Sequence, residues 1–115
     1  MQYMLLIYQN EAGLQQIRDR DVTEVTGAYL AFTKAMQDAG VLVGGDRLDR
    51  SVNATTVRAE NGKTKVLNGP YAETKEQLGG YYIIEAKDLD AALSWAARCP
   101  GTQHGAVEVR PIIKM

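Results

Sequence analysis

The elements that this sequence predicts form an α+β domain, in which an antiparallel sheet carries two helices on one face. Two kinds of pattern support this prediction. Short apolar or alternating runs indicate strands, and two stretches in which apolar residues recur every three or four positions indicate helices. The predicted order is strand, helix, strand, hairpin, strand, helix, strand, which gives two strand–helix–strand halves.

The N-terminal half begins with a strand and a helix. Residues 2–8 are almost entirely apolar, which suits a strand covered on both faces. From Asp21 onward the spacing changes to that of a helix. One helical stripe then carries Val22, Val25, Tyr29, Phe32 and Met36. We expect Asp21 to cap this helix together with Glu24, and Gly40 to end it.

The centre of the chain predicts a strand and a hairpin. Residues 41–43 form the strand, and the Gly44-Gly45 pair that follows predicts a bulge or a close approach of another backbone. Residues 55–58 and 63–67 are the expected strands of a hairpin that turns at Asn61-Gly62.

The C-terminal half repeats the strand–helix–strand pattern. Residues 81–84 are aromatic and β-branched, as is typical of a strand. Asp88 is the expected cap of a second helix that ends at Pro100-Gly101. The apolar face of that helix would consist of Leu89, Ala92, Leu93 and Ala96. Residues 106–113 alternate as a last strand, with Val107, Val109 and Ile113 on one side and Glu108 and Arg110 on the other.

These elements match the split βαβ, or ferredoxin-like, arrangement. Because two helices cover only one face of the sheet, the other face would carry the Glu108/Arg110 pair. It would also carry Tyr3 or Tyr8, and one of Tyr81 and Tyr82. A face that is half apolar and half charged suits neither solvent nor a closed core. We therefore expect a homodimer in which two sheets face each other across a cavity.

The bulk properties indicate one domain, spanning residues 1–115, without a nucleic-acid or membrane partner. The net charge is −1 and no block of like charges occurs, so nothing favours electrostatic capture of nucleic acid or an anionic membrane. No apolar run approaches the roughly 20 residues of a membrane span. The N-terminus lacks the pattern of a signal peptide, and the single Cys99 rules out an internal disulfide. The expected location is the cytoplasm.

The segment from Asn68 to Gly80 departs from its apolar surroundings. It carries charged residues, a Gly-Pro turn and a terminal glycine pair, and long connections in small domains tend to be functional or disordered. Residues 68–76 read Asn-Gly-Pro-Tyr-Ala-Glu-Thr-Lys-Glu. This stretch resembles the Asp-Gly-Pro-Phe signature of the YCII-related proteins, followed by Ala-Glu-Thr-Lys-Glu. Segments 3–8, 40–45, 88–92, 96–100 and 107–111 are also similar to that family, so the resemblance spans nearly the whole chain.

The resemblance implies a small ferredoxin-like domain that pairs as a dimeric α+β barrel. It also implies a regulatory link, since many members of this subgroup are encoded beside, or fused to, extracytoplasmic-function sigma factors. More distant relatives are thought to use a His-Asp pair, and one of them eliminates chloride from a chlorinated aromatic. This chain departs from the signature at Asn68, where the family has an acid, and at Tyr71, where it has Phe. Because an amide does not titrate, Asn68 weighs against catalysis at that position but could still cap a turn.

Several residues are candidates for chemistry, each with a structural alternative. Glu73 would move a proton and Lys75 would hold an anion, or both belong to a solvated surface cluster with Glu76. Asp46 follows the glycine pair and would place a second catalytic carboxylate at a pocket mouth, or it simply forms a turn.

A second group of candidates would line the dimer cavity. Arg110 and Glu108 would bind an anionic ligand there, or form an intersubunit salt bridge. Tyr81 would add a ligand-binding hydroxyl or only packing. His104, the only histidine, is expected in an exposed loop, so no pair of histidines can hold a metal. The glycine pairs are too short for a phosphate loop, and no cofactor is predicted.

Two classes of function stay open. The chain is a binding or regulatory module, which senses a small molecule or meets a sigma factor. Alternatively, it is a cofactor-free lyase or isomerase that acts on a small anionic or aromatic molecule. The missing acid at position 68, the lack of a histidine placed for catalysis and the lack of a cofactor motif favour the module.

Overall fold

The computed structural model describes residues 1–72 and 74–115, without the side chains of residues 13–25. Its strands and helices are β1 (Gln2–Asn10), α1 (Glu11–Asp38), β2 (Leu42–Arg47), β3 (Thr55–Glu60), β4 (Lys63–Asn68), β5 (Glu76–Glu85), α2 (Leu89–Ala97) and β6 (Gly105–Pro111). Two short 3-10 turns, η1 (Ser51–Asn53) and η2 (Pro100–Gln103), precede β3 and β6.

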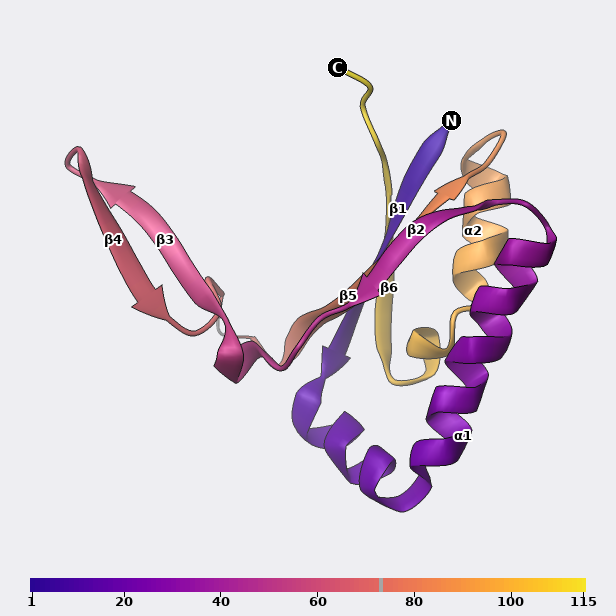
Figure 1. Cartoon of the computed structure of the whole chain (residues 1–115), viewed down its shortest axis with the longest axis horizontal. Coiled ribbons are helices and arrows are strands. Elements are labelled where there is room, and N and C mark those ends of the chain that lie inside the picture. Colours follow the sequence, from indigo (N-terminus) through magenta and orange to yellow (C-terminus); the bar gives the residue numbers. More distant parts are fainter. Residues whose placement is uncertain (73) are drawn as a thin grey trace.

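The main sheet has the strand order β2-β5-β1-β6, and all its neighbours are antiparallel. Both helices lie on one side of this sheet, and β3 and β4 form a separate ribbon that projects on the other side (Figure 1). The predicted ferredoxin-like α+β fold is therefore confirmed for the single chain. Whether two chains pair as a barrel stays a prediction.

The core lies between the sheet and the helices. Alternate residues of β1, namely Tyr3, Leu5 and Ile7, are buried on that side. They pack with Phe32 and Met36 of α1, Ile84 of β5, Ala92 and Ala96 of α2, and Cys99. This layer covers only one face of β1. Met4, Leu6 and Tyr8 on the other face are only half-buried, so the expected cover on both faces is not found within the described part of the chain.

Helix α1 begins earlier than the sequence predicts. Its expected start at Asp21 is wrong, because the helix runs from Glu11 and Asp21 lies in its interior. Residues 11–20 contain Glu, Ala, Leu, Gln and Arg, which favour helix, and no proline interrupts them. The side chains of the predicted Asp21–Glu24 cap lie outside the described residues. The expected end is confirmed, since Gly40 has a positive φ of 72° just beyond the helix.

The C-terminal half follows the prediction with two corrections. Asp88 caps α2 as expected, and its side chain accepts a hydrogen bond from the Ala91 amide at 2.9 Å. Leu89 and Leu93 do not join the buried face, since α2 turns Ala92 and Ala96 to the sheet and leaves both leucines almost half exposed. Similarly, β6 ends at Pro111, and Ile113 beyond it is exposed.

The segment 68–80 is less of a loop than the sequence indicates. Asn68 ends β4, and β5 already begins at Glu76, so the connection comprises residues 69–75 only. Strand β5 carries Gln77 to Glu85 alongside β1, with a bulge opposite Ile7 and Tyr8. A second bulge in β2 lies between Leu42 and Gly44, next to the glycine pair that predicts it.

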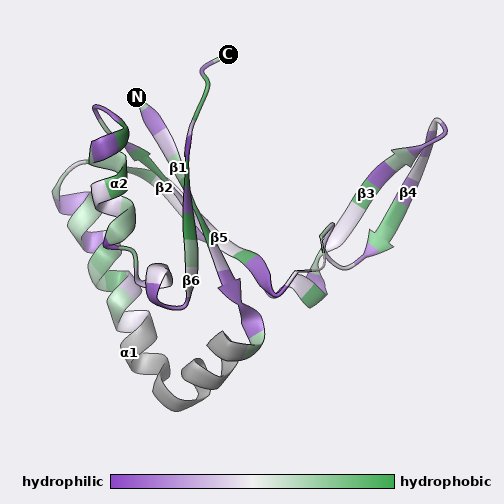
Figure 2. Ribbon diagram, turned by 180° about the vertical axis from the view of Figure 1, so that it is seen from behind, coloured by the Kyte–Doolittle hydropathy of each residue, from purple (hydrophilic) through white to green (hydrophobic). Residues whose placement is uncertain are grey.

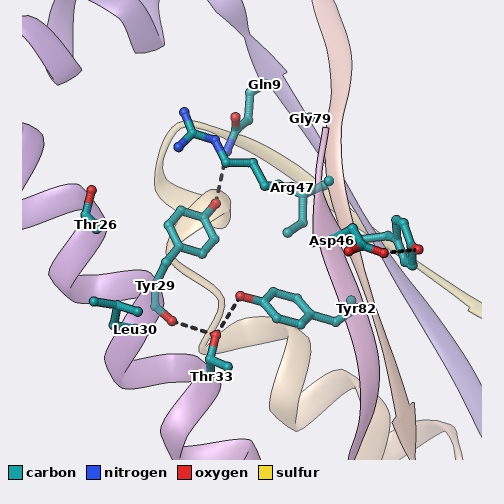
Figure 3. A pocket seen from close by; sticks show the side chains of 13 residues that line it. Gln9, Thr26, Tyr29, Leu30, Thr33, Asp46, Arg47, Gly79 and Tyr82 are labelled. Carbon is teal, nitrogen blue, oxygen red and sulfur yellow. Dashed lines mark hydrogen bonds between the residues drawn. The ribbon is translucent and has the colours of Figure 1, made fainter. Parts of the chain in front are cut away.

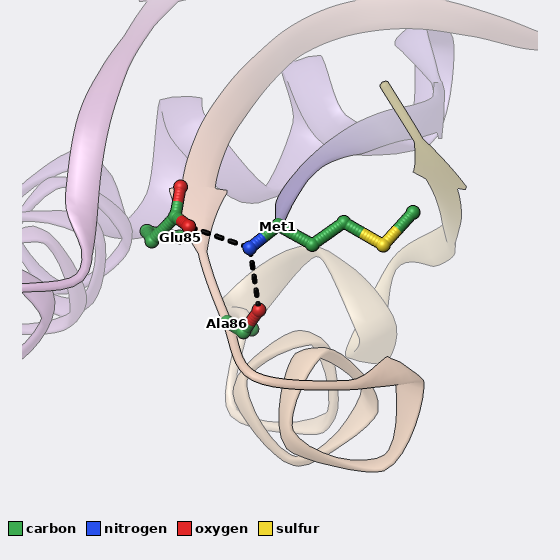
Figure 4. Close-up of polar contacts among 3 residues, drawn as sticks. All are labelled: Met1, Glu85 and Ala86. Atoms are coloured by element: carbon green, nitrogen blue, oxygen red, sulfur yellow. Dashed lines mark hydrogen bonds and ion pairs between the residues drawn. The ribbon is translucent and has the colours of Figure 1, made fainter. Parts of the chain in front are cut away.

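The first residue is tied to the end of β5 (Figure 4). The amino group of Met1 donates to the Glu85 carboxylate at 2.5 Å and to the Ala86 carbonyl oxygen at 3.2 Å. The ammonium group lowers the pKa of Glu85 below its ordinary value. Both groups are about half exposed, so this ion pair fixes the start of β1 rather than adding much stability.

The helix-free face of the sheet, here called the open face, presents a defined row of residues. Asp46 of β2 lies opposite Tyr81 of β5, Tyr81 opposite Leu6 of β1, and Leu6 opposite Glu108 of β6. Residues opposite each other share a face, so Tyr81 is the expected open-face tyrosine of β5, and Tyr8 that of β1.

Among the helices of the described residues, none combines the length and the apolar character that a membrane-spanning helix needs.

Candidate functional site

Four predicted site residues lie on the open face, where they form two separate pairs. The Tyr81 hydroxyl donates to the Asp46 carboxylate at 2.6 Å, and Arg110 Nε donates to Glu108 Oε1 at 3.0 Å. The carboxylate raises the pKa of Tyr81 above its ordinary value. The row from Asp46 to Glu108 crosses three strand spacings, or about 14 Å, so the two pairs lie at opposite edges of one sheet.

The other predicted residues do not join these pairs. Lys75 is exposed and lies in the connection just before β5, six residues before Tyr81 along the chain. His104 lies in the turn that follows η2, but its expected exposure is wrong, because it is half-buried there. Glu73 lies outside the described residues. In the part of the chain that the structure describes, no three His, Cys, Asp or Glu side chains are grouped to hold a metal ion.

A pocket of about 330 Å³ lies on the opposite, helix side of the sheet, between α1 and the paired strands β2 and β5. Its walls combine apolar and polar side chains (Figure 3). Ile7, Gln9, Tyr29, Leu30, Thr33 and Tyr82 line it, and Arg47 extends along its upper side toward Gln9. Asp46 contributes to the rim, but its carboxylate is turned away from Tyr29 and Tyr82.

Hydrogen bonds fix the polar groups of this pocket. The side-chain amide of Gln9, which is only 7% exposed, donates to the Tyr29 hydroxyl at 3.0 Å. Thr33 donates its one hydroxyl proton to the Tyr29 carbonyl oxygen at 2.8 Å. The Tyr82 hydroxyl is therefore the donor in its 2.9 Å contact with Thr33. Satisfied groups of this kind can be buried without the full cost of desolvation.

Glycines create the space for the pocket. A Cβ atom at Gly101 would come within 2.9 Å of the Tyr29 hydroxyl, so only glycine lets this ring reach its depth. A Cβ at Gly79 would meet Gln9 Oε1 at 3.0 Å, and one at Gly45 would meet the Tyr82 ring at 2.8 Å. Gly45 and Gly79 thus serve close packing, and Gly45 agrees with the predicted close approach at Gly44-Gly45, whereas a Cβ at Gly44 would meet no atom within 4 Å.

The electrostatics of the pocket favour binding over proton abstraction. Burial raises the pKa of Tyr29 well above its ordinary 10.0, and burial likewise raises that of Tyr82. Burial also raises the pKa of the Cys99 thiol nearby. These groups are therefore neutral donors and acceptors at physiological pH. Arg47 supplies a positive charge and has no ion-pair partner among the described side chains.

Comparison with known proteins places the chain in a family. The model of the YCII-related domain matches residues 1–115. The chain belongs to the YCII-related family. An uncharacterised protein of Rhizobium meliloti (strain 1021) is 36% identical over 114 residues, which cover 97% of this chain and 92% of that protein.

The fold of this YCII-related domain also occurs in a solved enzyme structure. The 5-chloro-2-hydroxyhydroquinone dehydrochlorinase of Burkholderia phenoliruptrix AC1100, in complex with 2,5-dihydroxybenzoquinone, superimposes with a TM-score of 0.57. The match covers all of this chain and 96% of the enzyme, at 19% sequence identity. At 19% identity, this structural similarity shows that the two chains share a fold.

The signature of this YCII-related domain has a structural role in the described residues. Asn68 pairs with Thr55 at the base of the ribbon, and the Gly69 amide donates to the Ala54 carbonyl oxygen at 2.7 Å. Gly69 has a φ of 100°, a conformation that requires glycine. The Tyr71 ring lies beneath the Arg58 guanidinium, 5.3 Å from it. This motif therefore sets how the ribbon leaves the sheet.

Proposed function

We propose that this YCII-related domain binds a small ring compound with acidic or hydroxyl groups in the pocket between α1 and the β2–β5 edge. The proposal rests on the polar network of Gln9, Tyr29, Thr33 and Tyr82 beneath Arg47. Arg47 has no ion-pair partner among the side chains that the structure describes. A core position needs no such groups, whereas ligand sites combine apolar walls with a few fixed polar groups. A volume of about 330 Å³ suits a single-ring molecule.

The roles of these residues follow from their chemistry. The Tyr82 ring packs edge-on against Phe32, with centroids 5.5 Å apart, so it forms a rigid wall for a flat molecule. Tyr29 and Tyr82 present neutral hydroxyl groups to polar substituents, and Arg47 holds a negative charge. The dihydroxybenzoquinone bound to the dehydrochlorinase is a compound of this class, which supports the choice of probe.

A thermal-shift screen tests this function. The probes are 2,5-dihydroxybenzoquinone, simple phenols and benzoates. A ligand at a hundred times its dissociation constant adds about 2.7 kcal/mol, which raises the Tm of a domain of this size by several degrees. We expect the shift to fall in Arg47→Ala and to persist in Arg50→Ala, which removes the same charge outside the pocket. No shift with any probe, or equal losses in the two variants, would contradict the proposal.

A lyase or isomerase activity is the second possibility for the same pocket, favoured by the fold shared with a dehydrochlorinase. It requires a base, and Asp46 points to the open face. Glu73→Gln with product analysis by mass spectrometry separates the two functions. Turnover of a bound probe by the wild type and its loss in Glu73→Gln would establish an enzyme. Binding without any product would instead support a binding or regulatory module.

The partner predictions concern the surface of the domain. We propose that the open face pairs with that of a second chain, because its centre at Leu6 and Tyr81 is apolar.

We also propose a regulatory role, in which the domain associates with an extracytoplasmic-function sigma factor. Co-purification of the two proteins with and without a pocket ligand tests it, and no association in either state would remove it.

A further inference from the structure

The ribbon formed by β3 and β4 has two chemically different faces. Residues opposite each other across the ribbon share a face, so Val57 lies with Val66 and Ala59 with Thr64. The other face carries four charged side chains, namely Arg58, Glu60, Lys63 and Lys65. Thr56 and Leu67, near the base of the ribbon, lie on this same face. Beyond them, the alternation of uncharged and charged pairs is typical of a sheet with one covered face and one face in water. We call the first the uncharged face of the ribbon.

Nothing in the described residues covers the uncharged face. Val57 is 64% exposed and Val66 is 63% exposed, although they lie opposite each other at the centre of the ribbon. The ribbon contacts the rest of the chain mainly at its base, where Gly69 binds Ala54. Hydrophobic and hydrophilic residues occur along its whole length, away from the helices (Figure 2). Because an isolated two-stranded hairpin is marginally stable in water, the ribbon requires a packing partner.

The dimensions of the chain indicate how large that partner surface is. The accessible surface is 8005 Å². A compact monomer of this mass exposes about 6,200 Å², so the chain exposes an excess of roughly 1,800 Å². The radius of gyration is 15.9 Å, against about 13 Å for a compact domain of this length. An excess of this size is what one protomer buries in an obligate homodimer, where total burial is roughly 2,000–5,000 Å².

We propose that the ribbon is an arm that packs its uncharged face against a second copy of this chain. The arm leaves the sheet after β2 and returns at β5, and it projects on the side of the open face (Figure 1). A partner whose sheet faces this sheet therefore occupies the space beside the arm. One two-fold axis then covers both the open face and the uncharged face in each protomer, and leaves neither exposed.

The reach of the arm fits this arrangement. Each strand of the ribbon has six residues, which span about 20 Å. Facing sheets pack about 10 Å apart, so the arm extends past the partner's sheet and contacts its flank. A different protein would have to match the open face and the arm together, whereas a second copy offers both surfaces in return.

Thiol accessibility tests the arm directly. Val66→Cys places a thiol on the uncharged face, and Lys65→Cys places one on the charged face of the same strand. The natural Cys99 is 1% exposed and serves as an unreactive background. The rate of modification by an aromatic disulfide reagent is measured across a dilution series in which sedimentation reports the mass. We expect the Val66→Cys thiol to react at least about tenfold more slowly in the dimer than in the monomer, and the Lys65→Cys thiol to react at the same rate in both.

Four results would overturn the proposal. A chain that stays at 12.6 kDa at every concentration would remove the partner. Equal rates for Val66→Cys in monomer and dimer would show that the arm lies free. Slow modification of Val66→Cys in the monomer would show that the arm packs on its own chain. If Lys65→Cys is protected in the dimer as strongly as Val66→Cys, the assignment of the uncharged face is wrong.

Discussion

Gln9 and Tyr29 depend on each other inside the pocket wall. Tyr29→Phe removes the acceptor of the buried Gln9 amide. We expect this change to cost about 1–3 kcal/mol of unfolding free energy, because a buried donor is left without a partner. In the double variant Gln9→Leu/Tyr29→Phe both polar groups are gone, so the loss should largely disappear. Urea unfolding of the four proteins measures the coupling, and strictly additive losses would contradict it.

The tyrosine hydroxyls also give a pH dependence. Burial raises the pKa of Tyr29 and Tyr82, so the folded state keeps both protons at a pH where the unfolded chain, with a pKa near 10.0, releases them. Stability is therefore complete below pH 10 and falls as the pH rises above it. An ultraviolet titration of phenolate should show these two tyrosines ionising only together with unfolding, and Tyr29→Phe should reduce the alkaline loss. Early ionisation of all six tyrosines would contradict the burial.

The individual pocket residues could not be predicted, because their positions in the sequence have simpler structural interpretations. Gln9 follows an apolar run and looks like its polar boundary, whereas β1 continues to Asn10 and turns Gln9 to the helix side. The adjacent Tyr81 and Tyr82 must point to opposite faces, but only the register of β5 against β1, which places Tyr82 opposite the buried Leu5, decides which face each takes. The role of Thr33 depends on its hydrogen bond with Tyr82, which is 49 residues away in the sequence.

The family signature includes Gly69, whose backbone conformation shapes the base of the ribbon. Gly69→Ala should lower the unfolding free energy by about 1 kcal/mol or more, since a φ of 100° is strained for alanine. Gly27→Ala is the matched control, because Gly27 lies at an exposed position of α1 where a Cβ would meet no atom within 4 Å. It should stabilise by about 0.5–1 kcal/mol. Chemical denaturation compares the two, and equal signs would contradict this interpretation.

The elements themselves followed from the sequence where local chemistry determines them. The Asn61-Gly62 hairpin, the Asp88 cap and the Gly40 stop are confirmed, because turn and cap residues act within a few positions. The start of α1 was missed because Asp21 and Glu24 imitate a cap inside a longer helix. The face of α2 was misjudged because the sheet, and not the helix, selects Ala92 and Ala96 for burial.

The whole molecule is flat, with extents of 47 × 43 × 18 Å. This shape agrees with the proposal that a second chain packs against its open face. Leu6→Lys places a charge at the centre of the open face and should convert a dimer into a 12.6 kDa monomer. Leu93→Lys makes the same change on the exposed side of α2, where no partner is proposed. Sedimentation equilibrium distinguishes them, and a Leu6→Lys dimer as tight as that of Leu93→Lys would exclude the facing sheets.

We propose that a ligand binds on the helix side of the sheet, in the pocket beside α1. NMR spectra of the methyl and side-chain amide groups test this placement. They are recorded during a titration with 2,5-dihydroxybenzoquinone or with the best probe of the thermal-shift screen. We expect saturable shifts at Gln9, Leu30 and Thr33, with small changes at Met4 and Leu6. Shifts concentrated at Met4 and Leu6 would place the ligand on the open face, between paired chains, and would contradict the pocket.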